Sequence, residues 1–197
     1  MKLPVYVTTA LLCALHASYA AELSPSRSKR SILEFGTLIE CATGGSWTDY
    51  TAYGCYCGFG GSGKPVDATD RCCQQHDRCY SKTKHGGSCP KNDKIFSMFG
   101  VEVPTIYAQT YEFTVDYCAT PSKVKMSCKR PNQYSYFRRM VMGKQLQCAF
   151  KLCECDRIAA QCFARNRKTY DTKYVDTSQI VNKRRCGPKN LRGLPMN

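Results

Sequence analysis

The spacing of apolar residues predicts three helices, separated by stretches of different composition. An amphipathic helix ending near Cys41 is expected from four apolar residues at helical spacing: Ile32, Phe35, Leu38 and Ile39. Asp67 followed by Asp70 has the form of an N-cap with an acidic first turn, and it predicts a helix through Tyr80. A third helix is expected over Gln147–Arg165.

The segments between these helices are irregular. Glycine and proline argue against regular structure over Ala52–Val66. Residues 90–147 are rich in tyrosine and lack helical periodicity, with a two-stranded extension expected near Tyr111–Met126. The pattern therefore predicts one mainly α domain with a small two-stranded β-wing.

The amino-terminal segment has the features of a secretion signal. Residues 1–20 carry Lys2, a short apolar core and the small residues Ser18 and Ala20 at the expected cleavage site. The core is shorter than the roughly 18 to 20 residues of a spanning helix, and no later segment reaches that length. Residues 21–30 end in Lys29-Arg30 and are interpreted as a propeptide of a zymogen that matures at Ser31, with the domain proper over 31–197. We expect a secreted, extracellular protein.

Cysteine is abundant, with 15 residues in the chain. Cys13 leaves with the signal, so 14 cysteines remain, an even number that predicts seven disulfides in an oxidising compartment. Each bridge typically contributes about 2 to 5 kcal/mol in such a domain. The disulfides should therefore fix the fold more than the apolar core does.

Cysteine spacing also predicts how two of the helices lie. Cys72 and Cys79 are seven residues apart, as are Cys155 and Cys162, so each pair lies on one face of its helix. Pairing Cys72–Cys162 and Cys79–Cys155 gives a constant sum of residue numbers, as antiparallel helices require. That register places Asp156 opposite His76.

The chain is strongly basic, with a formal net charge of +14. Removal of residues 1–30 takes away four basic residues and one acidic residue and leaves +11. Partners should be anionic: a phospholipid surface or sulfated glycans, since nucleic acid is not expected for a secreted protein. A basic tail begins near Ala164, with nine Lys or Arg against two Asp.

A glycine-rich loop precedes the second helix, which carries His76 and Asp77 at adjacent positions. Calcium binds six to eight oxygens, which carbonyls of such a loop and the Asp77 carboxylate could supply. His76 could then take a proton from water while Asp156 orients its ring. Gly58–Gly63 also fits a dinucleotide fingerprint, but no strand precedes it. Zinc binding by the cysteines is less favoured than disulfides in an oxidising compartment.

Three stretches resemble the secreted phospholipase A2 family: Tyr53-Gly-Cys-Tyr-Cys-Gly-Phe-Gly-Gly-Ser-Gly-Lys-Pro, Asp70-Arg-Cys-Cys-Gln-Gln-His-Asp-Arg-Cys-Tyr80 and Cys153-Glu-Cys-Asp-Arg-Ile-Ala-Ala-Gln-Cys162. The resemblance implies calcium-dependent hydrolysis of the sn-2 ester of glycerophospholipids. It implies that His76 is the base toward water, that Asp156 is its partner, and that Tyr80 hydrogen-bonds the aspartate.

The same resemblance implies a ligand set and a substrate slot. One calcium ion would be held by Asp77 and by the carbonyls of Tyr56, Gly58 and Gly60, and the Gly58 amide would help stabilise the oxyanion. Residues that would line the acyl-chain slot are Ile32, Phe35 and Ile39. Trp47 and Phe59 match positions that touch the lipid interface, although a core position for Trp47 is an open alternative.

Cys41 matches the pancreatic and elapid type of this family. The resemblance then implies five further disulfides: Cys41–Cys118, Cys55–Cys186, Cys57–Cys73, Cys89–Cys148 and Cys128–Cys153. The chain departs from that type in its longer stretches Cys89–Cys118 and Cys118–Cys148, so the sequence does not decide whether Tyr111, Tyr117 or neither replaces the family's second active-site tyrosine.

Two functions are compatible with this scaffold. The first is a secreted phospholipase, expected as a monomer or weak dimer. The second is a toxin-like receptor-binding or glycan-binding protein acting through its basic surface. Loss of the base or of a metal ligand would mark the second, whereas His76, Asp77, Asp156 and the loop glycines are all present.

Overall fold

The computed structural model describes residues 30–58, 60–89, 95–98, 101–118, 120–175 and 186. The predicted signal segment, residues 21–29 of the predicted propeptide, Phe59 and most of the basic tail lie outside these residues.

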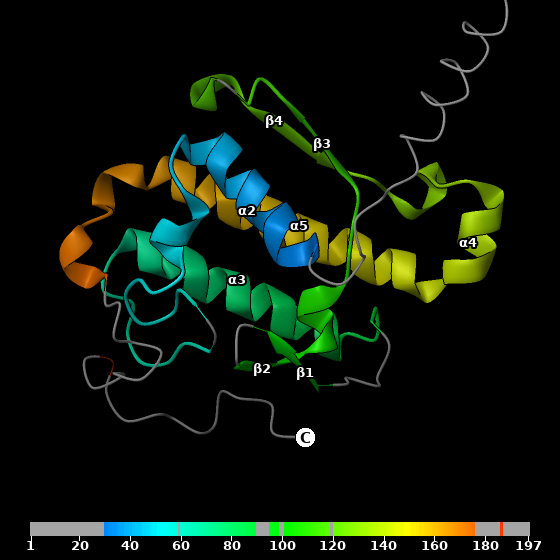
Figure 1. Cartoon of the computed structure of the whole chain (residues 1–197), viewed down its shortest axis with the longest axis horizontal. Coiled ribbons are helices and arrows are strands. Elements are labelled where there is room, and N and C mark those ends of the chain that lie inside the picture. Colours follow the sequence, from blue (N-terminus) through cyan, green and yellow to red (C-terminus); the bar gives the residue numbers. More distant parts are fainter. Residues whose placement is uncertain are drawn as a thin grey trace, which may run out of the picture.

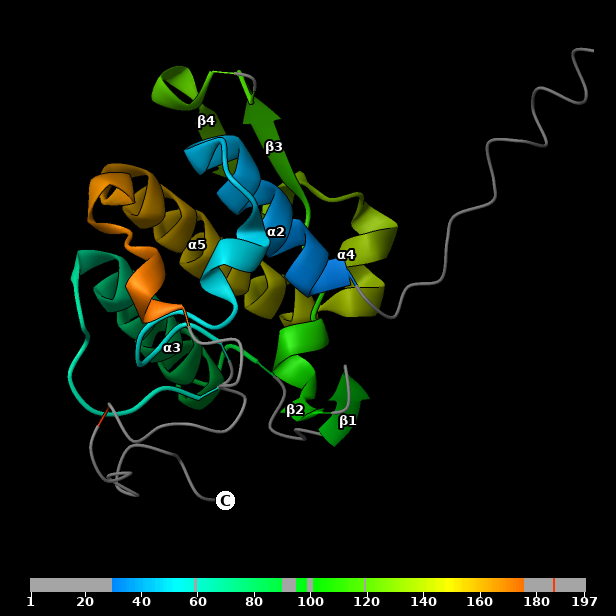
Figure 2. The same ribbon diagram turned by 60° about the vertical axis from the view of Figure 1, so that its left-hand side comes forward.

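Three helices form the centre of the molecule: α2 (Arg30–Thr43), α3 (Ala68–His85) and α5 (Lys144–Arg165). α3 and α5 lie side by side, and α2 packs on α5 (Figures 1 and 2). The mainly α fold predicted from the sequence is confirmed. In the part of the chain that the structure describes, no helix is both long and apolar enough to span a bilayer.

The start of α3 shows why its boundary could be predicted. The Asp67 side chain accepts a hydrogen bond from the Asp70 amide at 2.7 Å, as an N-cap residue does. Three basic residues lie in its last turn, where positive charge is favourable: Lys82, Lys84 and His85.

Two antiparallel hairpins extend from the helices. The hairpin of β3 (Phe113–Asp116) and β4 (Lys125–Cys128) lies where the two-stranded extension was predicted, with Phe113 opposite Cys128. The hairpin of β1 (Ile95–Met98) and β2 (Val101–Pro104) was not predicted. These two hairpins lie at opposite sides of the helical core (Figure 1).

A fourth helix, α4 (Tyr136–Met142), was also missed, and α5 begins three residues earlier than predicted. Ser135 caps α4 by accepting from the Arg138 amide at 3.3 Å. The prediction failed because the apolar residues of α4 do not face the core, so the usual core-facing periodicity is absent. Short 3₁₀ turns complete the described chain: η1 (Trp47–Tyr50), η2 (Thr105–Ala108), η3 (Pro121–Lys123), η4 (Pro131–Gln133), η5 (Arg167–Thr169) and η6 (Thr172–Tyr174).

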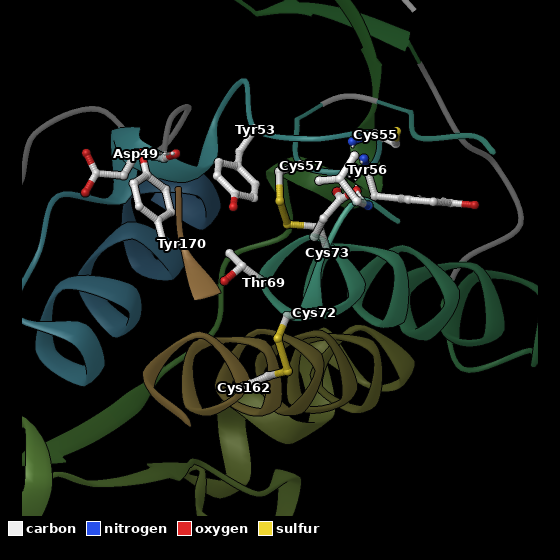
Figure 3. Close-up of a disulfide and its surroundings, with 12 residues drawn as sticks. Asp49, Tyr53, Cys55, Tyr56, Cys57, Thr69, Cys72, Cys73, Cys162 and Tyr170 are labelled. Atoms are coloured by element: carbon white, nitrogen blue, oxygen red, sulfur yellow. Dashed lines mark hydrogen bonds between the residues drawn. A yellow bond between two sulfur atoms is a disulfide. The ribbon is translucent and has the colours of Figure 1, made fainter. Parts of the chain in front are cut away.

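Seven disulfides join these elements, and they are the seven pairs named from the sequence: Cys41–Cys118, Cys55–Cys186, Cys57–Cys73, Cys72–Cys162, Cys79–Cys155, Cys89–Cys148 and Cys128–Cys153. Adjacent cysteines on α3 point in different directions, so Cys73 reaches the loop while Cys72 reaches α5 (Figure 3). One turn of α3 thereby anchors two parts of the molecule.

The only tryptophan of the chain, Trp47, lies half-buried against α2. Gly36 makes this contact possible, because a Cβ atom at that position would lie 3.0 Å from Trp47 Cγ. The indole of Trp47 is half-buried because it packs against the apolar cluster. An interfacial role for Trp47 stays a prediction.

Substitution of this glycine tests the packing of α2. We expect Gly36→Val to push the indole outward, to shift tryptophan fluorescence and to destabilise the protein by about 1 to 3 kcal/mol. Thr37→Val, at the neighbouring exposed position of α2, is the matched control and should change stability by less than about 0.5 kcal/mol. Equal thermal unfolding of wild type and Gly36→Val would contradict the observed contact.

Candidate active site

A histidine and an aspartate meet between the two disulfides that join α3 to α5. His76 Nε2 lies 2.6 Å from Asp156 Oδ1. The Asp156 side chain is fully buried, while 14% of the His76 side chain is exposed. The carboxylate is therefore shielded from water, and the imidazole keeps an open edge.

Two tyrosines hold the second oxygen of this carboxylate. Tyr80 donates to Asp156 Oδ2 at 3.1 Å, and Tyr111 donates to the same oxygen at 2.5 Å. Tyr117, the other candidate for the second tyrosine, is 62% exposed at the end of β3, so the structure brings Tyr111 and not Tyr117 to the site. Burial and the charge of Asp156 raise the pKa of both bound phenols well above the usual value, which keeps them protonated as donors.

The position of the carboxylate determines which imidazole nitrogen can act as a base. An ionised carboxylate only accepts hydrogen bonds, so Nε2 of a neutral His76 carries the proton. Nδ1 then has the free lone pair. This arrangement suits His76 to take a proton from a bound water while Asp156 stabilises the resulting cation.

Aromatic rings fix the plane of the imidazole. Phe35 of α2 stacks on His76 with ring centroids 4.5 Å apart, and Tyr80 packs against it at 4.6 Å. Tyr107 of η2 stacks on Tyr80 in turn at 5.2 Å. A cavity of about 30 Å³ between α3 and α5 also borders His76, and it is large enough for water.

The glycine loop is tied to α3 by a residue whose role the sequence analysis missed. Asp70 is fully buried, and its carboxylate accepts from the backbone amides of Cys55, Tyr56 and Val66 at 2.8–2.9 Å. These donors lie at the two ends of the loop. The signal was present in the motif Asp70-Arg-Cys-Cys, but the acidic residue was interpreted only as part of a helix start.

Asp77 faces the same loop. Burial raises the pKa of Asp77 to about 6, although the charge of His76 and a hydrogen bond from the Gly61 amide partly oppose the shift. A carboxylate held this way favours a cation beside it. Within the described ranges no three His, Cys, Asp or Glu side chains gather as a metal site, so a calcium ion beside Asp77 would need further oxygen donors such as backbone carbonyls or water.

The loop backbone fits that requirement. Gly58 and Gly60 have φ angles of 119° and 72°, which other residues rarely adopt. A Cβ atom on Gly58 would also lie 2.6 Å from the Thr51 carbonyl oxygen. Glycine at such φ angles permits the backbone to turn carbonyl groups toward one point, and hard oxygen donors of this type match calcium.

The three residues predicted to line the acyl-chain slot differ in how deeply they are buried. Phe35 lies directly against His76, and Ile32 is half-buried one turn earlier on α2. Ile39 is 3% exposed within the apolar cluster. The acyl-chain role of these three residues stays a prediction.

The two candidate tyrosines provide a matched pair for a stability test. Tyr111→Phe removes a hydrogen bond to a buried carboxylate, so we expect a loss of about 1.5 to 3 kcal/mol in the free energy of unfolding. Tyr117→Phe should change it by less than about 0.5 kcal/mol. Thermal unfolding of both variants checks this difference, and equal losses would show that the Tyr111 bond to Asp156 contributes nothing particular.

Sequence comparisons show which known proteins this chain is similar to. Residues 32–175 match the sequence profile of the family described as Phospholipase A2. Phospholipase A2 AP-PLA2-II of Acanthaster planci is 38% identical over 149 residues, covering 74% of this chain and 82% of the relative. Phospholipase A2 AP-PLA2-I of the same organism is 35% identical over 176 residues, covering 88% and 94%.

A relative from another organism gives the same result. Acidic phospholipase A2 KBf-grIB of Bungarus fasciatus is 38% identical over 135 residues, covering 68% of this chain and 75% of the relative. The chain belongs to the phospholipase A2 family, whose members are enzymes that hydrolyse phospholipid esters.

Proposed function

We propose that this chain is a secreted, calcium-dependent phospholipase A2 that releases the sn-2 fatty acid from glycerophospholipids. The observation that carries the proposal is the His76–Asp156 pair at 2.6 Å, because a proton on Nε2 facing Asp156 would leave Nδ1 of His76 free to act as the base. No serine nucleophile is needed, because water itself is the attacking group.

The protein side of the reaction follows from the contacts. Nδ1 of His76 would take a proton from water, and Asp156, with Oδ1 on Nε2, would stabilise the imidazolium. Tyr80 and Tyr111 keep the carboxylate in place from its other oxygen. The stacked Phe35 ring excludes water from one face of the imidazole and holds it in plane. General-base catalysis of this kind contributes about 10² to 10⁴ in rate.

Calcium ligands are proposed on the chemistry of the loop. Asp77 would supply the charged ligand, and the carbonyls of Tyr56, Gly58 and Gly60 the neutral ones. Bound calcium supplies a Lewis acid that polarises the ester carbonyl and stabilises the developing negative charge. The Gly58 amide would donate to the same oxygen, an interaction whose loss typically costs about 2.7 to 4 kcal/mol of barrier.

Processing before activity is part of the proposal. Residues 1–20 would direct secretion, and cleavage after Arg30 would leave a chain beginning at Ser31, the second residue of α2. The seven disulfides are typical of an extracellular protein and agree with this destination.

The base assignment is tested by His76→Gln in the protein that begins at Ser31. We expect kcat to fall by at least about 10²-fold on dispersed phospholipid with calcium present, because glutamine cannot accept the proton. His85→Gln, at the exposed end of α3, is the control and should keep wild-type activity. Substantial turnover by a correctly oxidised His76→Gln variant would exclude the water-base mechanism.

Calcium binding is tested without measuring turnover. Calcium at about one hundred times its Kd stabilises a protein by about 2.7 kcal/mol, a rise of roughly 5 to 10 °C in Tm for a chain of this size. We expect this rise for wild type and for Asp116→Asn, an exposed control on β3, but not for Asp77→Asn.

Without calcium, Asp77→Asn should not lower the stability of the protein and could raise it. Burial opposes ionisation of Asp77, whose pKa is raised to about 6, so its charge costs stability above that pH when no cation is bound. In chelator at pH 7.5, roughly one unit or more above that pKa, Asp77→Asn should therefore be as stable as wild type or more stable. A calcium-dependent Tm rise in Asp77→Asn would refute Asp77 as a ligand.

A further inference from the structure

Exposed apolar side chains concentrate on α4, the helix that the sequence did not predict. Of the seven large hydrophobic side chains that are exposed among the described residues, four lie on this single short helix. They are Tyr136, Phe137, Met140 and Val141, with exposures of 74%, 69%, 63% and 66%. Such clustering of apolar groups in water marks a surface that binds something.

The four residues share one face of α4. Tyr136 and Met140 are four residues apart, as are Phe137 and Val141, so the two pairs form adjacent rows on the helix surface. Arg138 and Met142 form the row that faces the protein, with Arg138 Nε 3.5 Å from Met142 Sδ. The apolar face is therefore the outward one.

The inward side of α4 is held firmly. Arg138 forms an ion pair with Glu112 at 2.7 Å, and its guanidinium lies 5.1 Å from the centre of the buried Tyr134 ring. Lys129 also pairs with Glu112 at 2.7 Å and lies over the same ring at 4.5 Å. Arg139 adds a bond to the Asn132 carbonyl oxygen at 3.0 Å. These contacts support α4 at its base and leave its apolar face uncovered.

The surrounding chain is uniformly positive. Residues 117–153 contain eight Lys or Arg and no Asp or Glu. Glu112, the acidic residue nearest to α4 in the contacts above, is already paired with Lys129 and Arg138. The apolar face is thus bordered by exposed cations, among them Arg130, Arg139 and Lys144.

We infer that α4 is a membrane anchor: its apolar face enters the surface of an anionic phospholipid bilayer while the flanking cations bind the headgroups. This inference rests on the proposed function, which requires the enzyme to reach lipid in a bilayer. A short helix with aromatic and aliphatic residues on one face and basic residues at its borders suits insertion parallel to the membrane plane. Charge complementarity favours anionic over zwitterionic lipid.

α4 lies apart from the residues of the proposed active site. It directly precedes α5 and projects from the end of the molecule away from the segment 51–66 (Figure 1). None of its residues contacts His76, Asp156 or Asp77 among the interactions described above. Substitutions on its apolar face can therefore be made without disturbing the reacting groups.

The test measures vesicle binding and turnover separately in the chain that begins at Ser31. Sedimentation with vesicles of phosphatidylglycerol and phosphatidylcholine in equal parts, in chelator so that no lipid is consumed, gives the partition coefficient. We expect the double variant Phe137→Ser, Met140→Ser to bind at least about tenfold more weakly than wild type. Tyr117→Ser, a matched exposed aromatic on the β3–β4 hairpin, should stay within about twofold.

Charge is tested in the same assay. Lys144→Glu should weaken binding to the mixed vesicles by about tenfold and leave the weaker binding to pure phosphatidylcholine unchanged. Lys125→Glu on β4 carries the same change in net charge and is the control, with a smaller loss expected. Equal losses for the two reversals would show that net charge alone, and not α4, attracts the protein to lipid.

Hydrolysis of a monomeric short-chain phospholipid separates this inference from the proposed function. All α4 variants should retain wild-type kcat/KM on that substrate. Absence of turnover in wild type would defeat the proposed function, while the vesicle data would still decide the role of α4. Wild-type vesicle binding by the double serine variant would overturn the anchor and make a protein partner the better explanation of the exposed face.

Discussion

The antiparallel pairing of α3 and α5 is the constraint on which the rest of the structure depends. Cys72–Cys162 and Cys79–Cys155 have the same Cα–Cα distance of 5.7 Å, so the two helices run at a constant separation between them. His76 lies between the two cysteines of α3, and Asp156 lies next to Cys155 on α5. The imidazole and the carboxylate therefore meet because the helices are fixed in register, without any loop having to bring them together.

Other parts of the site are attached to the same pair of helices. Cys57–Cys73 and the buried Asp70 attach the glycine loop to the first turns of α3, one covalently and one through three backbone amides. Asp77 lies on the next turn of that helix. The proposed metal site and the proposed base consequently share one rigid element, which keeps their relative positions constant even though the loop itself contains several glycines.

The sequence predicted the structure best where the regular spacing of residues along a helix determines which side chains meet. Helical spacing and paired cysteines were sufficient to predict α2, α3, most of α5 and the meeting of His76 with Asp156. It was least informative for contacts between distant segments. Nothing local distinguishes Tyr111 from Tyr117, because the choice depends on how the chain between Cys89 and Cys118 returns to the buried carboxylate. The role of Asp70 was missed because its partners, 4 to 15 residues earlier in the chain, lie in an irregular loop where no periodic spacing indicates which groups meet.

The failure at α4 has a different cause and bears on how this enzyme could vary. Periodicity methods assume that apolar residues face a core, whereas α4 directs Tyr136 and Phe137 outward and is supported through ion pairs and a buried tyrosine. Cys128–Cys153 ties the chain that precedes α4 to α5, and at its other end α4 continues directly into α5. Because both ends are fixed covalently, the chain between them can lengthen or change its surface without moving α5. A lipid-binding surface can therefore diverge on this scaffold while the Asp156 carboxylate stays in place.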